Sequence, residues 1–320
     1  MKYKIGMGLF AILFMMSMSG CYQQRIEVVP AVTSSYLTVR DDAGRKVVLT
    51  KKPERIVPLS QSIADLLYAA GGNAAGRPSS STGNLPKDIE MLPEVGHISN
   101  INTEKLISLQ PDLVIGYQGL HERLIPIMES SNIPFIIMKI KTYDDVVKNI
   151  KLFGDITGGQ EQAKIAVSQM NQRIAKVTDR LPAVSKNAAI LHATGNSVTV
   201  QLENSIAGDV AKIIKLNNVA AGSIPIDGNT ESTPYSIEKL VATDPDIIFI
   251  TFMGAKDDIE KRLRLEVKSN PAWNGLRAVQ NEQVFYLPME LFLLNPGMRY
   301  DEAVAYMANL VYPDRYNTVQ

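Results

Sequence analysis

A stretch of 13 residues occurs twice in this chain, and the repetition constrains the fold more than any other feature. Residues 103–115 read TEKLISLQPDLVI, and residues 237–249 read IEKLVATDPDIIF. Glu, Lys, Leu, Pro and Asp recur at matching places, and several other pairs are apolar in both copies. In each copy Glu-Lys-Leu is typical of the start of a short helix and Pro-Asp is typical of its end. The apolar run that follows is typical of a strand. A helix, Pro-Asp and a strand also form a common connector, but the shared spacing favours duplicated architecture.

Short apolar runs alternate with amphipathic segments around both copies. The expected strands are 36–39, 47–50, 55–59, 112–117, 134–140, 187–193, 197–202, 246–252 and 284–287. The expected helices are 61–70, 120–130, 143–157, 206–215 and 259–267, followed by a last helix that ends near Tyr312. Ser60 and Thr142 are expected to cap two of these helices. Such alternation is typical of a parallel sheet with helices on its faces, so the sequence predicts an α/β fold.

One segment between the copies follows a different pattern. Apolar residues recur at steps of three and four from Ala163 to Leu181, and Pro182 ends the pattern. This spacing predicts a single helix of about 22 residues, hence about 33 Å long. The chain has 320 residues, a comfortable length for two domains. We therefore predict two similar α/β lobes, each with a central sheet, at residues 36–158 and 183–320, joined by one long α-helix at residues 159–182.

The first 20 residues have the three-part pattern of a secretory signal peptide. A basic start is followed by an apolar run from Gly6 to Met16, which is shorter than the roughly 20 residues of a membrane-spanning helix. The end of this segment resembles a bacterial lipobox, in which the signal is cut before a cysteine that is then acylated. Residues 1–20 are thus predicted to be a lipoprotein signal peptide, Cys21 the lipidated residue, and residues 21–35 a polar tether. The alternative is an ordinary signal peptide with a chance cysteine. The expected location is the cell membrane, through the lipid anchor only, facing the periplasm or the extracellular side.

Composition and motifs exclude several classes of function. Lys plus Arg is 33 and Asp plus Glu is 33, so the formal charge is zero, and no basic cluster interleaved with aromatic residues predicts a nucleic-acid partner. Cytosolic cofactors are not expected outside the cytoplasmic membrane, and no resident cofactor is predicted. No G-x-S-x-G, H-E-x-x-H or P-loop motif occurs, so the chain is not expected to be an enzyme. Trp273 is expected to pack in the second lobe.

The order of motifs resembles a known family. Five features follow the lipobox in a fixed order. They are ERIVPLSQSIADLLYAAGG, VGHISNINTEKLISLQPDLVIGY, a lone long helix, TPYSIEKLVATDPDIIFITFMG and NPAWNGLRAVQNEQVFYLP. Together they resemble the substrate-binding lipoproteins of ABC importers for iron-siderophores, heme and cobalamin, which are helical-backbone periplasmic binding proteins. The resemblance implies a rigid helix between the lobes, a ligand between them, a monomer, and an ABC permease dimer with its cytoplasmic ATPase as partners.

The resemblance also implies a role for the repeat. Members of that family dock on the permease through one surface carboxylate per lobe, in the helix before each Pro-Asp strand. The matching residues here are Glu104 and Glu238. A pseudo-symmetric pair of acidic residues suits a two-fold symmetric partner with two equivalent basic pockets. The alternative for each glutamate is a first-turn residue that favours the helix dipole.

Ligand-binding residues are expected in loops that follow the carboxyl ends of the strands. The candidate ligand-binding residues are Ser60, Gln61, His97, Ile98, Tyr117, Gln118, His192, Met253, Met289, Glu290 and Phe292. The loops that hold them contain almost no Lys or Arg, whereas a tris-catecholate ligand would need several cations. They suit a weakly charged or amphiphilic metal complex. The ligand would carry iron as a siderophore or heme, or alternatively cobalt as a corrinoid, and core packing is the alternative role for the two methionines and Phe292.

Three histidines occur in the chain. His97 and His192 fall in expected ligand-binding loops of opposite lobes, while His121 is expected at the surface, where a helix begins. Two imidazoles could ligate a heme iron or a bare metal, but receptors for free zinc or manganese gather more histidines with carboxylates. No protein metal site is therefore predicted. The expected function is capture of an iron complex for an ABC permease. The further alternatives, in order, are a corrinoid receptor, a bare metal-ion receptor and a surface adhesion lipoprotein.

Overall fold

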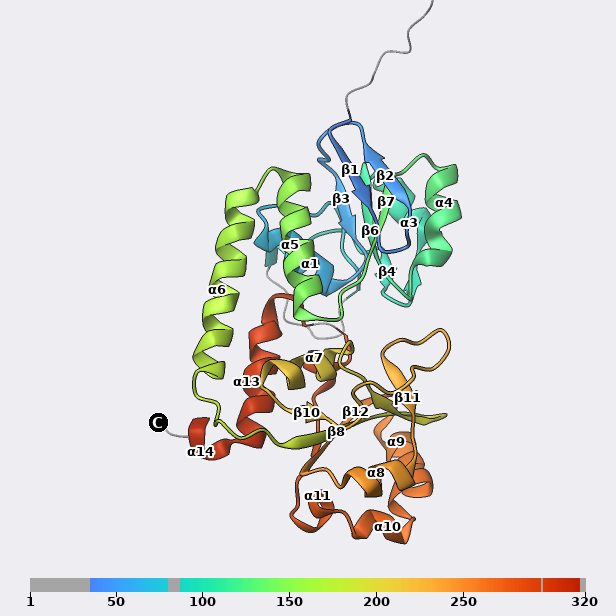
Figure 1. The fold of residues 1–320 in the computed structure, drawn as a ribbon. Coiled ribbons are helices and arrows are strands. Elements are labelled where there is room, and N and C mark those ends of the chain that lie inside the picture. The colour runs from blue at the N-terminus through green and yellow to red at the C-terminus, as the bar shows by residue number, and fades with distance from the viewer. Residues whose placement is uncertain (1–34, 80–86, 295, 317–320) are drawn as a thin grey trace, which may run out of the picture. The chain divides into compact units, whose positions relative to one another are not determined.

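The computed structural model describes residues 35–79, 87–294 and 296–316, and it contains two α/β lobes joined by a long helix (Figure 1). Residues 35–320 form one compact unit. The predicted signal peptide, Cys21 and nearly all of the predicted tether lie outside the described residues. The exact lobe boundaries given above stay a prediction.

The N-terminal lobe is built on a parallel sheet in the order β3-β6-β7. These strands are Ile56–Pro58, Leu113–Tyr117 and Phe135–Met138. A hairpin of β1 (Leu37–Arg40) and β2 (Lys46–Leu49) precedes them, and β4 (Gly96–His97) pairs with β5 (Asn100–Ile101). The helices are α1 (Gln61–Ala69), α2 (Lys87–Glu90), α3 (Thr103–Ser108), η1 (Glu122–Leu124), α4 (Ile125–Ser130) and α5 (Tyr143–Thr157). Ser60 caps α1 and Thr142 caps α5, as predicted.

The C-terminal lobe is built on a six-stranded mixed sheet. Its order is β11-β9-β8-β12-β13, and β10 pairs with the start of β8. These strands are Ser232–Pro234, Val198–Gln201, Asn187–Thr194, Ile247–Met253, Val284–Tyr286 and Asn217–Asn218. The expectation of a parallel sheet is wrong for β9 and β11. The chain turns back within a few residues after β8, so β9 runs antiparallel to it, and β11 is antiparallel to β9.

Helices cover this second sheet as well. They are α7 (Ile206–Ile213), α8 (Ile237–Thr243), α9 (Lys256–Leu263), η2 (Arg264–Lys268), α10 (Pro271–Asn274), α11 (Arg277–Gln280), α12 (Met289–Phe292), η3 (Gly297–Arg299), α13 (Tyr300–Val311) and α14 (Pro313–Tyr316). The helix expected at residues 259–267 begins earlier, and its last turn is a π-helical segment, η2. Trp273 is buried in this lobe, as predicted.

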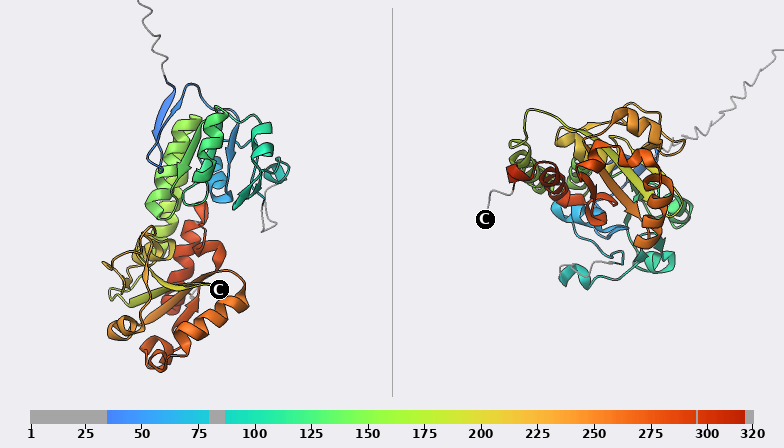
Figure 2. Two further views of the ribbon diagram at one scale, coloured as in Figure 1. Left: turned by 90° about the vertical axis from the view of Figure 1, so that its right-hand side faces the viewer. Right: turned by 90° about the horizontal axis from the view of Figure 1, so that it is seen from below.

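The linking helix is α6, Gln160–Thr178, with 19 residues instead of the predicted 22. It runs beside α5 of the first lobe and α13 of the second (Figures 1 and 2). Its buried positions Ala163, Met170 and Ile174 belong to one apolar core that also includes residues of α1, α5, α7 and α13. The helix is therefore packed into both lobes along its length.

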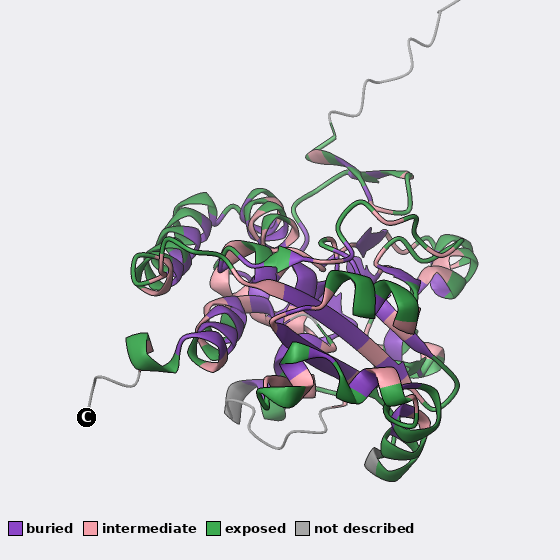
Figure 3. Ribbon diagram, turned by 60° about the horizontal axis from the view of Figure 1, so that its bottom comes forward, coloured by how far each residue is buried: buried purple, intermediate pink, exposed green. Residues whose placement is uncertain are grey.

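Each sheet also has a second apolar face of its own. In the first lobe the second core gathers β3, β6 and β7 residues such as Val57 and Val114 with Leu106 of α3. In the second lobe it gathers Ala189 and Ile248 with Leu240 of α8. Figure 3 shows the resulting pattern, in which buried strands lie between helices that expose their outer sides. The copied Leu of each repeat thus anchors its helix to its own lobe.

The Pro-Asp of each copy has the same structural task. The Asp112 carboxylate accepts hydrogen bonds from the backbone N–H groups of Glu54 (2.9 Å) and Arg55 (2.8 Å), immediately before β3. The Asp246 carboxylate accepts one from the backbone N–H of Asn187 (2.8 Å), at the start of β8. Each aspartate therefore sets the register of the strand that becomes the parallel neighbour of its own.

Candidate functional site

The two lobes meet beside the carboxyl ends of their strands. The Asp209 carboxylate of α7 accepts hydrogen bonds from the backbone N–H of Tyr143 (2.8 Å) and from the hydroxyl of Tyr300 (2.6 Å). Tyr143 belongs to the first lobe, and its ring lies 5.5 Å from that of Tyr300. A Cβ atom added at Gly297, whose φ is +60°, would lie 3.2 Å from the carbonyl oxygen of Ser62 in α1. These contacts bring the loops after β3 and β7 close to the second lobe.

His192 lies near the carboxyl end of β8, and one nitrogen of its ring hydrogen-bonds a neighbouring residue. The Thr251 hydroxyl lies 2.9 Å from His192 Nδ1 and 3.3 Å from the carbonyl of Leu191. The contact with Nδ1 orients the ring. Burial lowers the pKa of His192, and the positive charge of Lys141 lowers it further. Both effects favour the neutral imidazole, which is the form that ligates iron.

Lys141 follows β7 and reaches the second lobe. Its Nζ lies 3.2 Å from the carboxylate of Glu231, and the two side chains are 22% and 29% exposed. The same Nζ lies 5.6 Å from the centre of the Tyr117 ring. A half-buried cation thus lies close to two of the predicted ligand-binding residues, Tyr117 and His192.

A second polar group surrounds the start of α1. Gln61 donates from Nε2 to the Asp65 carboxylate (2.8 Å), while its buried Oε1 finds no hydrogen-bond partner within the described residues. Burial raises the pKa of Asp65, against the hydrogen bond from Gln61 and the charge of Arg299. The pKa of Arg299 is itself raised, first by its hydrogen bond to Glu302, and also by the negative charges of Glu290 and Asp65. Arg299 is therefore close to Glu290 of its own lobe and to Asp65 of the other lobe, and Asp65 is the hydrogen-bond partner of Gln61.

An apolar hollow of about 380 Å³ lies at the carboxyl ends of β12 and β13. It is lined by Phe252, Tyr286, Ile259 and Glu260. The rings of Phe252 and Tyr286 meet edge to face, with their centres 6.3 Å apart. The neighbouring Met253 is 53% exposed. Exposed apolar side chains at strand ends can bind the flat face of an organic ligand. A larger hollow of about 750 Å³ lies by Lys186 and Gln283, at the amino ends of β8 and β13, and so away from these residues.

Several predicted ligand-binding residues are placed in the protein interior. Ser60 is 2% exposed and caps α1. Tyr117 is 2% exposed and donates its hydroxyl to the carbonyl of Ile140 (2.7 Å). Phe292 is 2% exposed in the shared core, 6.2 Å from the ring of Tyr306. Packing and local hydrogen bonds already involve these three side chains, and their direct contact with a ligand stays a prediction.

Other predicted residues lie nearer the surface. Gln118 is half-buried and donates from Nε2 to the carbonyl of Asp42 (2.7 Å). His97 is exposed, with Nδ1 at 2.8 Å from the Ser99 hydroxyl. Met289 is half-buried, and Glu290 is exposed at the start of α12. Their role in ligand binding stays a prediction.

The expectation that His121 lies at the surface is wrong. His121 is fully buried. Its Nδ1 accepts from the backbone N–H of Tyr117 (2.8 Å), so Nε2 donates to the carbonyl of Ile98 (2.7 Å). Burial lowers the pKa of His121. The ring is a neutral bridge between two loops, because both loops carry backbone groups that the sheet leaves unpaired.

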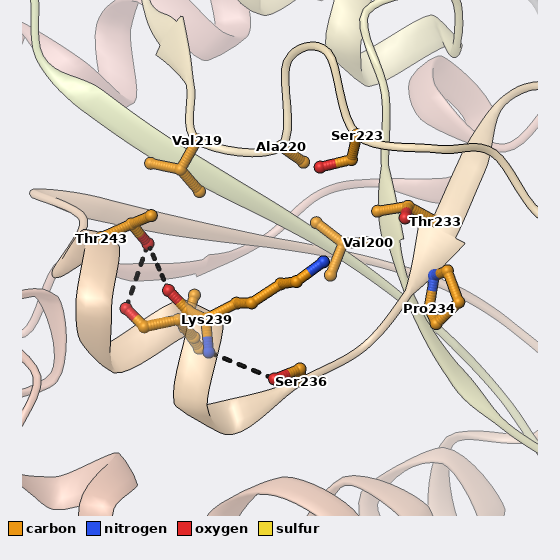
Figure 4. Close-up of a pocket in the computed structure, with 10 residues that line it drawn as sticks. Val200, Val219, Ala220, Ser223, Thr233, Pro234, Ser236, Lys239 and Thr243 are labelled. Atoms are coloured by element: carbon orange, nitrogen blue, oxygen red, sulfur yellow. Dashed lines mark hydrogen bonds between the residues drawn. The ribbon is translucent and has the colours of Figure 1, made fainter.

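The predicted docking glutamates are both exposed, at matching places in α3 and α8. Asn102 caps α3 and Ser236 caps α8. The Ser236 hydroxyl also donates to the Glu238 carboxylate (2.8 Å). Behind α8 lies a small cavity of about 40 Å³, across which the side chain of Lys239 extends (Figure 4).

Sequence reasoning missed two residues of this region, Lys141 and Asp209. The signal for Lys141 was present, since the loop between β7 and α5 follows the carboxyl end of a parallel strand like the other candidate loops. Asp209 gave no such signal, because a first-turn aspartate is ordinary in any helix. The statement that the candidate loops are almost without cations therefore does not hold for the whole region.

The described residues contain no group of three or more His, Cys, Asp or Glu side chains arranged to hold a metal ion. The same residues form no helix with the length and apolar character of a membrane span.

Comparisons with known proteins give relatives for this geometry. A family model described as "Periplasmic binding protein" matches residues 56–291. The ABC transporter substrate-binding lipoprotein YvrC of Bacillus subtilis (strain 168) is 23% identical, over 99% of each chain. The high-affinity heme uptake system protein IsdE of Staphylococcus aureus (strain MRSA252) is 26% identical, over 83% of this chain and 90% of its own.

Two solved structures share the fold. The structure of S. aureus IsdE complexed with heme has a TM-score of 0.69 at 24% identity, covering 81% of this chain and 98% of its own. The structure of S. aureus SirA complexed with staphyloferrin B has a TM-score of 0.68 at 19% identity, covering 88% and 98%. Both support the two-lobe architecture described above.

Proposed function

The chain belongs to the periplasmic binding protein family, and from this premise we propose that it captures an iron complex, heme or a ferric siderophore, for an ABC importer. As a substrate-binding protein of this kind it works with a permease and its ATPase and takes a small ligand outside the cytoplasm. The finer proposal, an iron complex, draws on the relatives, because one is named for heme uptake and another has a structure with staphyloferrin B.

The chemistry of the region supports a metal that arrives already chelated. The three histidines have separate hydrogen-bond partners. His121 bridges two loops, His97 pairs with Ser99 and His192 pairs with Thr251. A siderophore supplies all ligands of its iron, and a heme iron needs only one or two from the protein. A single neutral imidazole is therefore sufficient.

The observation that carries the proposal is the orientation of His192. The Thr251 hydroxyl hydrogen-bonds Nδ1, in the manner of the outer-shell hydrogen bonds that orient ligating histidines, so Nε2 is the nitrogen that would bind iron. Exposed Met253 lies on the same face of the sheet as His192 and offers it an apolar neighbour, whereas the hollow beside Phe252 and Tyr286 lies on the opposite face.

Absorbance spectroscopy tests the proposal directly. Purified protein would be titrated separately with hemin, a ferric trihydroxamate, a ferric carboxylate siderophore and cobalamin. We expect one-to-one binding of an iron complex. If hemin is the ligand, the Soret band of the bound hemin should have the same position in the wild type and in His97→Ala. In His192→Ala it should have a different position. Saturation by cobalamin alone, or by none of these compounds, would contradict the proposal.

Docking and anchoring complete the proposed function. Glu104 and Glu238 would meet the permease, and Cys21 would carry the lipid that keeps a monomeric protein near it. Cys21→Ala should leave the precursor unlabelled by a fatty-acid probe in cells, whereas the wild type is labelled. Equal labelling of both would contradict the lipid anchor without affecting ligand capture.

A further inference from the structure

The Lys141–Glu231 ion pair connects the two lobes next to the proposed ligand site. Lys141 belongs to the loop between β7 and α5, and Glu231 directly precedes β11 at the edge of the other sheet. Their charged atoms are 3.2 Å apart, with 22% and 29% of the side chains exposed. A pair so placed is screened less than a surface pair, and leaving Lys141 without a negative partner there is unfavourable.

The surroundings of Lys141 are those of an anion-binding residue. Its Nζ lies near the Tyr117 ring and close enough to lower the pKa of His192 by its charge. The neighbouring Asp145 carboxylate instead accepts the backbone N–H groups of Lys141 and Thr142 (3.0 Å each) and pairs with Lys139. The side chain of Lys141 is thus left to the opposite lobe.

Glu231 is held by its backbone and not by its carboxylate. Its N–H donates to the Asn229 side chain (3.0 Å), and its carbonyl accepts from the N–H of Leu202 (2.8 Å). Its carboxylate pairs with Lys141. The side chain can therefore leave Lys141 without loss of the β9–β11 pairing.

We infer that Lys141 binds a carboxylate of the transported iron complex, and that this carboxylate takes the place of Glu231. This inference rests on the proposed function and narrows it to iron complexes that carry carboxylates. Exchange of one carboxylate for another keeps Lys141 neutralised in both states. An iron complex without carboxylates offers nothing to replace Glu231 and should bind with the ion pair intact.

Affinity measurements with matched ligands and matched variants test the inference. The ligands are hemin and hemin dimethyl ester, and ferric citrate and a ferric trihydroxamate, so that each pair differs in free carboxylates. Lys141→Gln should weaken binding of the carboxylate-bearing member by about tenfold or more and leave the other nearly unchanged. Lys139→Gln, which removes a charge from the same loop, is the control. Lys141→Arg should restore most of the affinity.

Glu231→Gln gives the opposite expectation. Without a competing carboxylate, binding of the carboxylate-bearing ligand should tighten by about three- to tenfold, whereas Glu203→Gln in the same lobe should change nothing. Lys141→Gln should also raise the pKa of His192, measured by NMR, because a nearby positive charge is removed.

The outcomes separate the two proposals. If the wild type binds none of the four ligands, the proposed function fails and this inference fails with it. If the wild type binds but Lys141→Gln weakens both members of a pair equally, the inference alone is overturned. Unchanged affinity in Glu231→Gln would likewise overturn the exchange of carboxylates.

Discussion

The two copied segments, α3 with β6 and α8 with β12, share a scaffold and differ in how they are anchored. In both, the residue before Pro-Asp has a left-handed backbone, with φ of 48° at Gln110 and 37° at Asp244. In both, an arginine from another segment binds carbonyls of that turn. Arg55 reaches the carbonyl of Leu109 at 2.6 Å, and Arg277 reaches that of Asp244 at 2.7 Å. Only in the second copy does the arginine also pair with the side chains of the turn.

The comparison separates residues that the fold needs from residues that it does not. The shared Leu is buried in both copies, the shared Pro is buried, and the shared Asp holds a neighbouring strand. The shared Glu and Lys are exposed in both. Packing therefore explains three of the five repeated residues. The proposed docking would explain the recurrence of Glu104 and Glu238, beyond their place in the first turn.

The largest effect is expected from charge reversal at these glutamates. Glu104→Arg or Glu238→Arg should strongly reduce uptake, and the double variant should abolish it, because both proposed contacts with a basic partner are reversed. Ligand affinity and thermal stability should stay nearly unchanged. Glu161→Arg, in the first turn of α6, is the matched control. If the double variant binds the purified permease as tightly as the wild type, the docking proposal is contradicted and the repeat has only a structural role.

Removal of the copied aspartates should cost stability unequally. Asp112→Ala leaves two backbone N–H groups without their charged acceptor, whereas Asp246→Ala leaves one and also removes an exposed ion pair with Arg277, which contributes little. We expect the free energy of unfolding in urea to fall by about 2–3 kcal/mol and about 1.5 kcal/mol, respectively. Asp112→Asn keeps an acceptor and should lose less. Equal losses in the two alanine variants would show that the copies are anchored alike.

Glycine at the left-handed position should act differently in the two copies. Gln110→Gly relieves the cost of a left-handed backbone and should raise the free energy of unfolding by about 0.5–1 kcal/mol. Asp244→Gly gives the same relief but removes the carboxylate that accepts from Arg277 Nε at 2.6 Å. We expect no gain there. Urea denaturation of both variants checks this, and a gain at Asp244 would mean that the ion pair contributes nothing.

The smallest effect concerns the carboxyl group of Glu238. The pKa of Glu238 is lowered by its own backbone N–H and by the Ser236 hydroxyl. A lowered pKa in the folded state gives a stabilisation that is present above the ordinary pKa and is lost as the pH falls through the folded-state value. Ser236→Ala should raise the pKa of Glu238, measured by NMR titration, with Ser108→Ala as control. An unchanged pKa of Glu238 would show that the Ser236 hydroxyl does not stabilise its carboxylate.

The fold was largely predictable because its signals are local. The repeat, the caps at Ser60 and Thr142 and the helical spacing of α6 each depend on residues close in the sequence. The antiparallel β9 and β11 and the burial of His121 were not predictable in this way, since they depend on contacts made after the chain has folded. The same holds for the ligand region, where Tyr117 and Phe292 belong to the core and Lys141 meets a residue 90 positions later, Glu231.

The position of Asp209 has a kinetic consequence. Its carboxylate holds the amino end of α5 and the hydroxyl of Tyr300 together, beside a helix packed into both lobes. Separating the lobes at this point would break the hydrogen bond from the Tyr143 N–H to a charged group, which contributes about 1.5–3 kcal/mol, whereas the Tyr300 bond lies within the second lobe. Spontaneous opening should therefore be infrequent and a bound ligand should leave slowly. Rapid unloading would require work supplied from outside, which a docked transporter driven by ATP can provide.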